Sequence, residues 1–296
     1  MRDNIYLYAV ASNLFFALGS QVFAYYSRKF SSLWMNFFKA TIAIFCFSLT
    51  LVWLGEFSLI SLTPMLVFLT SGFIGLGMGD VFLLNGFAKI GPGRTMVLFS
   101  FQPLIIGILS YFLFDQSVDE RKLVAIFFFL ACIIIFAMES FRATKKWDLS
   151  GILYAFIGMT VDAIGILLTR YAFDYDSSIT AWQGNFYRTS GAILFFILLI
   201  NFKPINLVQN FKSLHLGSKS IVIIGAILGT FLSLGCYLIA IQQANLATLT
   251  ALSINATIFA SLFECIIYKK WPSRYLIISF IFFFGGMNYL LDLNLF

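Results

Sequence analysis

One apolar stretch sets the fold class of this chain. Residues 65–87 read MLVFLTSGFIGLGMGDVFLLNGF, and Asp80 is their only charged side chain. A helix of about 20 apolar residues spans the roughly 30 Å hydrocarbon core of a bilayer. The stretch is continuously apolar and does not alternate between apolar and polar positions, which favours a membrane-spanning helix over a barrel strand.

Comparable stretches cover most of the chain. The ten predicted spans are residues 5–24, 33–54, 65–87, 94–114, 122–138, 150–170, 181–201, 219–241, 247–268 and 274–292. The connections between them are short, and the longest, at 139–150 and 202–218, leave no room for a soluble domain. We therefore predict an all-α membrane protein with ten transmembrane helices.

The composition agrees with a protein whose main solvent is lipid. Of the 296 residues, 60% are hydrophobic and only 11% are charged, and the mean hydropathy is +0.93. A soluble domain carries roughly 25% charged residues. Arg2 precedes the first apolar run, as in a signal peptide. That run is about 20 residues long and lacks a persuasive cleavage site, so we interpret it as the first span.

Several other classes of site are not expected. The four cysteines lie inside apolar spans without the spacing of a disulfide framework or a metal site. The basic residues are dispersed among short loops, which argues against a nucleic-acid surface. The single histidine, His215, lies in a predicted loop with no paired acid nearby in sequence, and no nucleotide-binding loop occurs. We predict no cofactor, no metal and no enzymatic activity.

The loop charges predict an orientation. We call the side that holds the N-terminus side A, and the side that holds the first loop side B. Thirteen lysine and arginine residues fall to side B and four to side A, while Lys39 and Arg188 lie inside spans. Basic loops are retained in the cytoplasm. Side B is therefore predicted to be cytoplasmic, with both termini outside a cell (inner) membrane.

The second half of the sequence resembles the first. At shifts of 146 to 153 residues, the matched positions are Tyr8-Ala9 with Tyr154-Ala155, Gly19 with Gly165, Phe38-Lys39-Ala40-Thr41 with Tyr187-Arg188-Thr189-Ser190, Gly72 with Gly225, Asp80 with Ser233, and Ser100-Phe101-Gln102-Pro103 with Ser253-Ile254-Asn255-Ala256. We predict two repeats, residues 1–140 and 149–296. Five helices per repeat is an odd number, so the second repeat is inverted and a site is expected at the midplane between the two.

A motif in the first half resembles a known family. Its parts are Gly79-Asp80-Val81-Phe82, Ala88-Lys89-Ile90-Gly91, Arg94, Pro103 and Asp115. The motif is similar to the first-half signature of the drug/metabolite transporter (DMT) superfamily, and most similar to that of its EamA-like branch. Lys39 and Arg188, each early in the second helix of its repeat, fit the same pattern. In the second half Ala256 replaces the usual proline and Lys269 lies near the usual acidic position, which argues against a symmetric mechanism.

The resemblance implies a fold and a broad activity. It implies ten helices in two inverted repeats around a central cavity, which is lined mainly by the first, third and fourth helix of each repeat. Proteins of this superfamily carry amino acids, sugars, nucleotide sugars, choline-like cations and drugs. The resemblance therefore leaves the substrate open.

Polar side chains at membrane depth are costly, so they usually face a cavity or a partner helix. The candidate substrate-binding residues are Asn13, Gln21, Asp80, Asn85, Gln102, Asp162, Tyr237, Ser253 and Asn255. Asp162 lies near the middle of its span and is either a site for a coupling proton or a hydrogen-bonded structural acid. Both interpretations stay open at this point.

Two stripes of small and polar residues along predicted helices can be explained by helix packing instead of substrate binding. They comprise Gly158, Asp162, Gly165 and Thr169 in one span, and Thr250, Ser253, Thr257, Ser261 and Glu264 in another. Small and hydroxyl side chains let membrane helices pack closely. For the serines and threonines, and for the glycine pairs 75/79 and 225/229, helix packing is the favoured interpretation.

Three further charges lie within or beside the spans. Lys39 and Arg188 are near the starts of their helices, so we expect them to snorkel toward opposite membrane faces and to act as gating or structural charges. Glu264 is expected to form an interfacial ion pair with Lys269 or Lys270.

The leading functional prediction is a secondary active transporter of a small metabolite that works by alternating access. We expect an exporter, and the many aromatic side chains favour an aromatic or other bulky amino acid as substrate. The alternatives are a carrier of drugs, cations, sugars or nucleotide sugars with the same fold, and a non-transporting intramembrane enzyme, receptor or channel. The expected partners are the substrate, the lipid bilayer and a coupling proton, with the protein a monomer or a weak dimer.

Overall fold

The computed structural model describes residues 2–102, 104–105, 120–144, 149–243 and 254–291, and these residues form helices without a strand. The elements are α1 (Arg2–Lys29), α2 (Ser32–Leu54), α3 (Leu62–Ser71), η1 (Gly72–Gly79), α4 (Asp80–Ile90), α5 (Pro92–Phe99), α7 (Glu120–Thr144), α8 (Ser150–Tyr175), α9 (Ala181–Ile200), α10 (Leu207–Lys212), α11 (Leu216–Ala226), η2 (Ile227–Leu232), α12 (Ser233–Gln243), α14 (Ile254–Tyr268) and α15 (Arg274–Leu291). The predicted spans are largely helical where the structure describes them, although the helix of the fourth span ends at Phe99 and a turn follows at Ser100 and Phe101.

Some of the predicted features fall outside the described residues. These are the end of the fourth span and the start of the ninth, with Pro103, Asp115, Thr250 and Ser253. Within the described residues, five helices are long and apolar enough to cross a membrane, namely Leu7–Lys29, Ser32–Leu54, Leu62–Ile90, Ser150–Tyr175 and Leu216–Gln242. Shorter apolar helices at Phe127–Glu139 and Asn255–Tyr268 lie within two further predicted spans.

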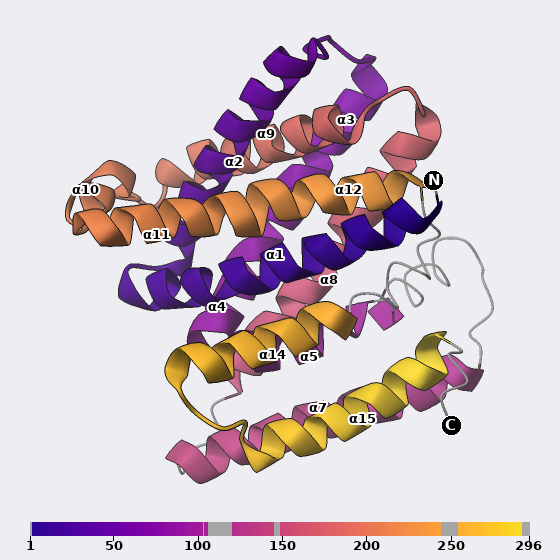
Figure 1. Ribbon diagram of the computed structural model, residues 1–296, viewed down its shortest axis with the longest axis vertical. Coiled ribbons are helices and arrows are strands. Elements are labelled where there is room, and N and C mark those ends of the chain that lie inside the picture. Colours follow the sequence, from indigo (N-terminus) through magenta and orange to yellow (C-terminus); the bar gives the residue numbers. More distant parts are fainter. Residues whose placement is uncertain (1, 103, 106–119, 145–148, 244–253, 292–296) are drawn as a thin grey trace.

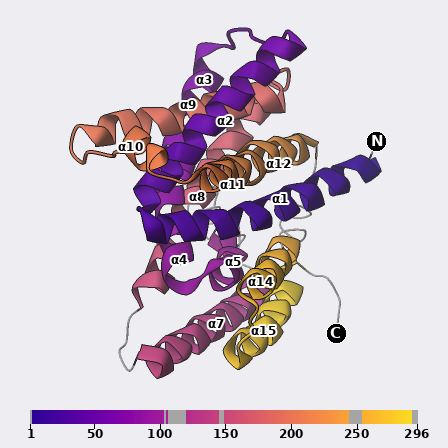
Figure 2. The same cartoon turned by 60° about the vertical axis from the view of Figure 1, so that its left-hand side comes forward.

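The helices of the two repeats are interleaved (Figures 1 and 2). The first helix of the chain, α1, packs against α12 and α14 of the second repeat, while α8, the first helix of the second repeat, packs against η1 and α4 of the first. The last helices of the repeats, α7 and α15, pack against each other. The beginning of α1 and the end of α15 lie at the same end of the bundle, as an even number of spans requires.

The third helix of each repeat contains a π-helical segment in its middle. In the first repeat η1 joins α3 to α4, and in the second η2 joins α11 to α12. Hydrogen bonds from residue i to i+5 leave backbone carbonyls less well paired, and such segments often occur at functional sites. The Asn36 side chain donates to the carbonyls of Leu76 and Gly77 at 2.9 Å. In the second repeat, Asn185 donates to the carbonyl of Leu234 at 2.9 Å.

Glycines allow the first helix of each repeat to approach the π-helical segment of the other. A Cβ atom at Gly165 would lie 3.0 Å from the Cα of Gly75, so α8 and η1 touch backbone to backbone. Gly19 of α1 meets Gly229 of η2 in the same way. These contacts support the helix-packing interpretation of the glycine pairs 75/79 and 225/229.

Local capping signals fix several helix ends. Thr180 and Gln183 form a capping box at the start of α9. The side chain of His215 accepts a hydrogen bond of 3.3 Å from the backbone N–H of Gly217 and so caps α11. The single histidine therefore has a structural role in the described part of the chain.

Candidate functional site

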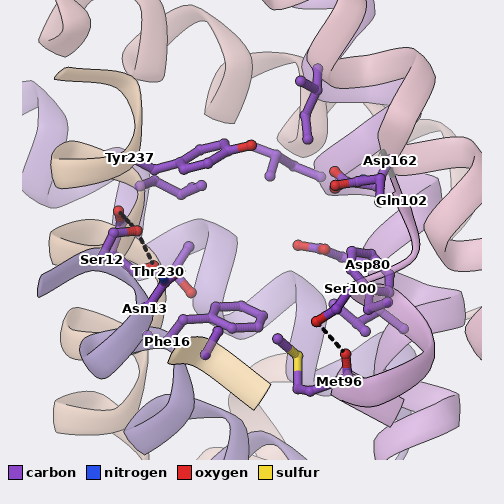
Figure 3. A pocket seen from close by; sticks show the side chains of 18 of the residues that line it. Ser12, Asn13, Phe16, Asp80, Met96, Ser100, Gln102, Asp162, Thr230 and Tyr237 are labelled. Carbon is purple, nitrogen blue, oxygen red and sulfur yellow. Dashed lines mark hydrogen bonds between the residues drawn. The ribbon is translucent and has the colours of Figure 1, made fainter. Parts of the chain in front are cut away.

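A cavity lies where the two repeats meet, at the level of η1 and η2 (Figure 3). Helices from both repeats line it with Ala9, Ser12, Asn13, Phe16, Lys39, Leu76, Asp80, Leu83, Met96, Phe99, Ser100, Gln102, Asp162, Ile166, Arg188, Gly229, Thr230, Ser233, Leu234, Tyr237 and Ala256. The volume open to the centre of a water molecule is about 160 Å³. One water needs about 10–15 Å³ by this measure, so the cavity has room for a small metabolite.

The charged groups of the first repeat in this cavity are paired. The Nζ atom of Lys39 on α2 lies 2.5 Å from Oδ2 of Asp80, the first residue of α4. Lys39 is 3% exposed and Asp80 is 7% exposed. Lys39 also lies over the ring of Phe23, 5.2 Å from its centroid. The two opposite charges offset each other's burial.

Asp162, near the middle of α8, lies on the same side of the cavity as Asp80 and Gln102 (Figure 3). Nε2 of Gln102 donates to Oδ2 of Asp162 at 2.9 Å. Tyr237 extends across the cavity from α12 toward this pair (Figure 3). Asp162 is therefore held by an amide rather than by a cation in direct contact.

Arg188 has incomplete hydrogen bonding although it is 1% exposed. Its Nε donates to Oγ of Ser71 at 3.1 Å. Its Nη1 is buried and has no hydrogen-bond partner among the described residues. Within the same residues no carboxylate oxygen lies within the 4.0 Å of an ion pair to Arg188. A buried guanidinium N–H without an acceptor is costly, so this group is suited to bind a ligand acceptor.

The structure brings together part of the predicted substrate site. Asn13, Asp80, Gln102, Asp162 and Tyr237 all line the cavity.

The other predicted binding residues are placed differently. Gln21 donates to the carbonyl of Ala260 at 3.0 Å and joins α1 to α14. Asn85 accepts from Ser32 at 3.1 Å and joins α4 to α2. Asn255 is half-buried on α14 but does not line the cavity, and Ser253 lies outside the described residues.

The structure corrects the expectations for the three further charges. Lys39 and Arg188 do not snorkel to opposite faces, because both are buried and line the same central cavity. Glu264 accepts a hydrogen bond of 2.7 Å from the backbone N–H of Gly93, and it makes no ion pair with Lys269 or Lys270 among the described residues. Glu264 thus anchors α14 to the start of α5.

Sequence reasoning missed Ser12 and Thr230 in the lining, whereas the repeat had matched Ser233 with Asp80. Ser12 on α1 donates to the carbonyl of Ser233 on α12 at 2.9 Å, and the two side chains form part of the cavity wall. Thr230 lies in η2, which no sequence signal had marked. Ser233 follows the second π-helical segment as Asp80 follows the first.

Hydrogen bonds also join four helices near side B. Arg28, near the end of α1, donates to the carbonyls of Phe87 and Ala88 at 3.0 and 2.7 Å and to the hydroxyl of Tyr268 at 3.2 Å. Together with the Gly93–Glu264 hydrogen bond, these contacts join α1, α4, α5 and α14. The cavity-lining part of α1 is its N-terminal half, from Ala9 to Phe16, which is displaced toward side A.

The hydroxyl side chains on α14 are spaced along one face of the helix, and this face packs against α5 and the residue that follows it. Thr257 and Ser100 share a hydrogen bond of 2.5 Å, and Thr257 also donates to the carbonyl of Met96 at 3.2 Å. Arg94 of the family-like motif makes hydrogen bonds of 2.5 and 2.6 Å with the two carboxylate oxygens of Glu139 and so fixes α5 to α7. These residues hold the fourth helix of each repeat in place beside the cavity.

Comparisons with known proteins agree with this geometry. The model of the EamA-like transporter family matches the chain twice, over residues 4–138 and 149–291. A solved structure described only as "Crystal structure of protein" has the same fold, with a TM-score of 0.67, 16% identity, and coverage of 98% of this chain and 96% of that one. No curated protein matches the sequence. The chain therefore belongs to the EamA-like transporter family of the DMT superfamily, a multi-pass membrane protein of ten helices in two inverted repeats around a central cavity.

Proposed function

We propose that the protein is a secondary active transporter that exports a small zwitterionic metabolite, an aromatic or other bulky amino acid, by alternating access. The family supports a DMT-type transporter. The observation that carries the finer proposal is the buried Nη1 of Arg188, which lacks an acceptor in a cavity that also holds Asp162.

The charged groups match the two ends of an amino acid. Arginine binds carboxylates strongly, because its planar N–H groups present parallel donors. A Cβ atom at Gly75 would lie 3.3 Å from Oδ1 of Asp162 and 3.8 Å from Nη2 of Arg188, so the two groups flank one point. A carboxylate on Arg188 and an ammonium on Asp162 would each gain a partner of opposite charge. Since Lys39 and Asp80 already pair with each other, the remaining charges favour a neutral zwitterion over a net ion.

The rest of the wall supports a bulky apolar side chain on that substrate. Phe16, Met96, Phe99, Leu83 and Ile166 supply apolar and aromatic surface to the cavity. Burial of such a side chain gives affinity without further polar groups.

The closed contacts at side B support alternating access. In this conformation the substrate would exchange with side A, and transfer to side B requires the hydrogen bonds of Arg28 and Glu264 to break. Inverted repeats allow such an exchange, because each half can adopt the conformation of the other.

A carrier of cations is the second candidate, and the presence of both Asp162 and Tyr237 in the cavity wall favours it. A cation such as choline would use the acid and the aromatic ring but would gain nothing from Arg188. The dependence of transport on Arg188 therefore separates the two candidates.

The test is a counterflow assay in proteoliposomes. Each preparation is loaded with one amino acid, or with choline to test the cation candidate. We expect Arg188→Gln to lower amino-acid exchange about ten- to hundred-fold, the loss of a charged hydrogen bond. Arg170→Gln is the matched control, because Arg170 is only partly buried and lies outside the cavity. Melting temperatures of both variants confirm folding. If no solute moves under any imposed gradient, the transporter proposal fails; if choline moves independently of Arg188, the cation carrier replaces it.

A further inference from the structure

A second cavity lies outside the central site, as a groove between α14 and α15 toward side B. The two helices are joined by the short connection 269–273 but pack against different partners, α14 against α1 and α5 and α15 against α7. The volume of the groove open to the centre of a water molecule is about 580 Å³, and its walls are mostly apolar, with Ile258, Leu262, Ile266, Leu276, Ile277 and Phe280.

The walls of this groove face the lipid rather than the protein interior. Leu262 is 51% exposed, Ile266 60% and Ile277 50%. These helices belong to a ten-helix membrane protein, so the surrounding solvent at this depth is hydrocarbon. An apolar groove open to lipid is filled by acyl chains unless a second protein covers it.

The mouth of the groove is basic and lies where the helices reach side B. Lys269, Lys270 and Trp271 line it, and Trp271 is 95% exposed. Neither lysine makes an ion pair within the described residues. The nearby acids are engaged elsewhere, Glu264 with the backbone of Gly93 and Glu139 with Arg94. Tryptophan favours the headgroup level of a membrane, and basic pockets between helices bind anionic headgroups.

The backbone at the mouth holds the lysines in a specific position. The N–H of Lys270 donates to the carbonyl of Cys265 at 3.0 Å and that of Lys269 to the carbonyl of Ile266 at 3.2 Å, which is the Schellman pattern at a helix end. Lys269 has φ of 50°, in the left-handed region where glycine is the usual residue. A lysine in this strained position indicates that its side chain is used there.

We propose that this groove is a binding site for an anionic phospholipid. Its acyl chain lies between α14 and α15, and its phosphate is bound by Lys269 and Lys270 while Trp271 packs at the glycerol level. Charge complementarity favours this occupant over a zwitterionic lipid, because the two lysines carry positive charge that no protein acid balances. The site is independent of the transported substrate.

Trp271 is itself the probe for this proposal. The full-length protein is placed in bilayers that contain dibrominated phosphatidylglycerol or dibrominated phosphatidylcholine at equal mole fraction. The signal of Trp271 is the difference in fluorescence between the unmodified protein and the variant Trp271→Phe. We expect phosphatidylglycerol to quench Trp271 at least two-fold more strongly than phosphatidylcholine. Lys269→Gln with Lys270→Gln should abolish this preference, whereas Lys203→Gln with Lys212→Gln, in another side B loop, should leave it intact.

Other outcomes overturn the proposal. Equal quenching by the two lipids, or loss of the preference in the control variant, would show that only the bulk surface charge attracts the anionic lipid. Quenching that weakens as the protein-to-lipid ratio rises would identify a second copy of the chain as the occupant.

A single substitution separates the lipid-binding role of Lys269 from a structural one. Lys269→Gly relieves the left-handed backbone and removes one charge. We expect a higher melting temperature in lipid-free detergent together with a weaker phosphatidylglycerol preference in bilayers. If the preference is unchanged in Lys269→Gly, Lys269 does not bind the headgroup and the proposal is wrong for this residue.

Discussion

The ion pair between Lys39 and Asp80 links α2 to α4 where both side chains are buried in the wall of the cavity. Asp80→Asn leaves the ammonium of Lys39 buried without a counter-charge, so we expect the free energy of unfolding to fall by about 3 kcal/mol. Lys39→Met combined with Asp80→Asn removes both charges and should recover most of that loss. Unfolding by SDS titration in detergent micelles measures each variant.

A surface pair in the same chain is the control for this prediction. Arg170 and Asp174 pair at 3.0 Å on α8, where the side chain of Asp174 is 59% exposed. Asp174→Asn should cost less than about 1 kcal/mol. Equal losses for Asp80→Asn and Asp174→Asn, or a double variant as unstable as Asp80→Asn alone, would contradict the buried ion pair.

Asp162 is the candidate for a coupling proton, because it is a half-buried acid that lines the cavity and makes no ion pair among the described residues. If it exchanges a proton during the transport cycle, Asp162→Asn abolishes uphill transport driven by a pH gradient. Exchange of substrate down its own gradient should continue at a reduced rate, because the neutral amide still accepts a hydrogen bond from the substrate ammonium but no longer offers it a counter-charge. Uptake into proteoliposomes at several external pH values measures both activities. A pH dependence identical to that of the unmodified protein removes Asp162 from proton coupling and leaves it a substrate-binding or structural acid.

The sequence predicted which polar residues lie at membrane depth better than it predicted which way they face. Gln21 and Asn85 were as plausible as Asn13, but their amides donate to neighbouring backbone carbonyls instead of lining the cavity. Hydropathy gives the depth of a side chain, whereas its direction depends on which helix packs beside it. The prediction that Lys39 and Arg188 reach the membrane faces is wrong for the same reason. Their positions near the starts of their helices do not reveal that neighbouring helices bury these side chains.

At the scale of elements, the approach of α8 to η1 depends on Gly165. Gly165→Val would place a branched side chain against the Cα of Gly75, which lies 3.0 Å from the position of a Cβ atom, and against the carbonyl of Ser71 at 3.1 Å. We expect a loss of about 1–3 kcal/mol in unfolding free energy, because overpacking displaces backbone that cannot move aside. Gly217→Ala is the control, since its Cβ atom meets only His215 Nδ1 at 3.8 Å. Equal stability of the two variants would contradict close helix packing at Gly165.

The helices themselves were predictable from hydropathy, but the π-helical segments were not. Each predicted span matches a helix in the described residues, because about 20 apolar residues can satisfy their backbone hydrogen bonds in lipid only within a helix. The segments η1 and η2 depend on tertiary contacts. One example is the side-chain amide of Asn36, which donates hydrogen bonds to two backbone carbonyls of η1. The matching Asn185 lies three residues before Arg188, as Asn36 lies three before Lys39, and that sequence signal was overlooked.

At the scale of the whole molecule, the repeats are alike in fold but unlike in charge. Asp80 pairs with Lys39 in the first repeat, whereas its counterpart in the second repeat is Ser233, so Arg188 has no acid in the matching position. Ser233→Asp should give Arg188 the partner that Lys39 already has. We expect this variant to lose amino-acid exchange about ten-fold or more, because its carboxylate competes with that of the substrate for Arg188.

The neutral variant Ser233→Ala removes the hydroxyl without adding charge, and it should retain most of the exchange activity. Counterflow in proteoliposomes compares the two. Equal loss in both variants would mean that the hydrogen bond between Ser12 and Ser233, and not competition for Arg188, determines the result.

The orientation of the whole molecule is predicted from the loop charges, with thirteen basic residues in the side B loops against four at side A. Basic loops stay in the cytoplasm, so side A, with both termini, should face outward. In a background without the four native cysteines, Leu59→Cys tests a side A loop and Phe202→Cys a side B loop; Leu59 is 90% and Phe202 87% exposed. A membrane-impermeant maleimide should label Leu59→Cys in intact cells, and Phe202→Cys only after lysis. The reverse labelling would place the closed end of the cavity outside, and the conformation described here would then face the cytoplasm.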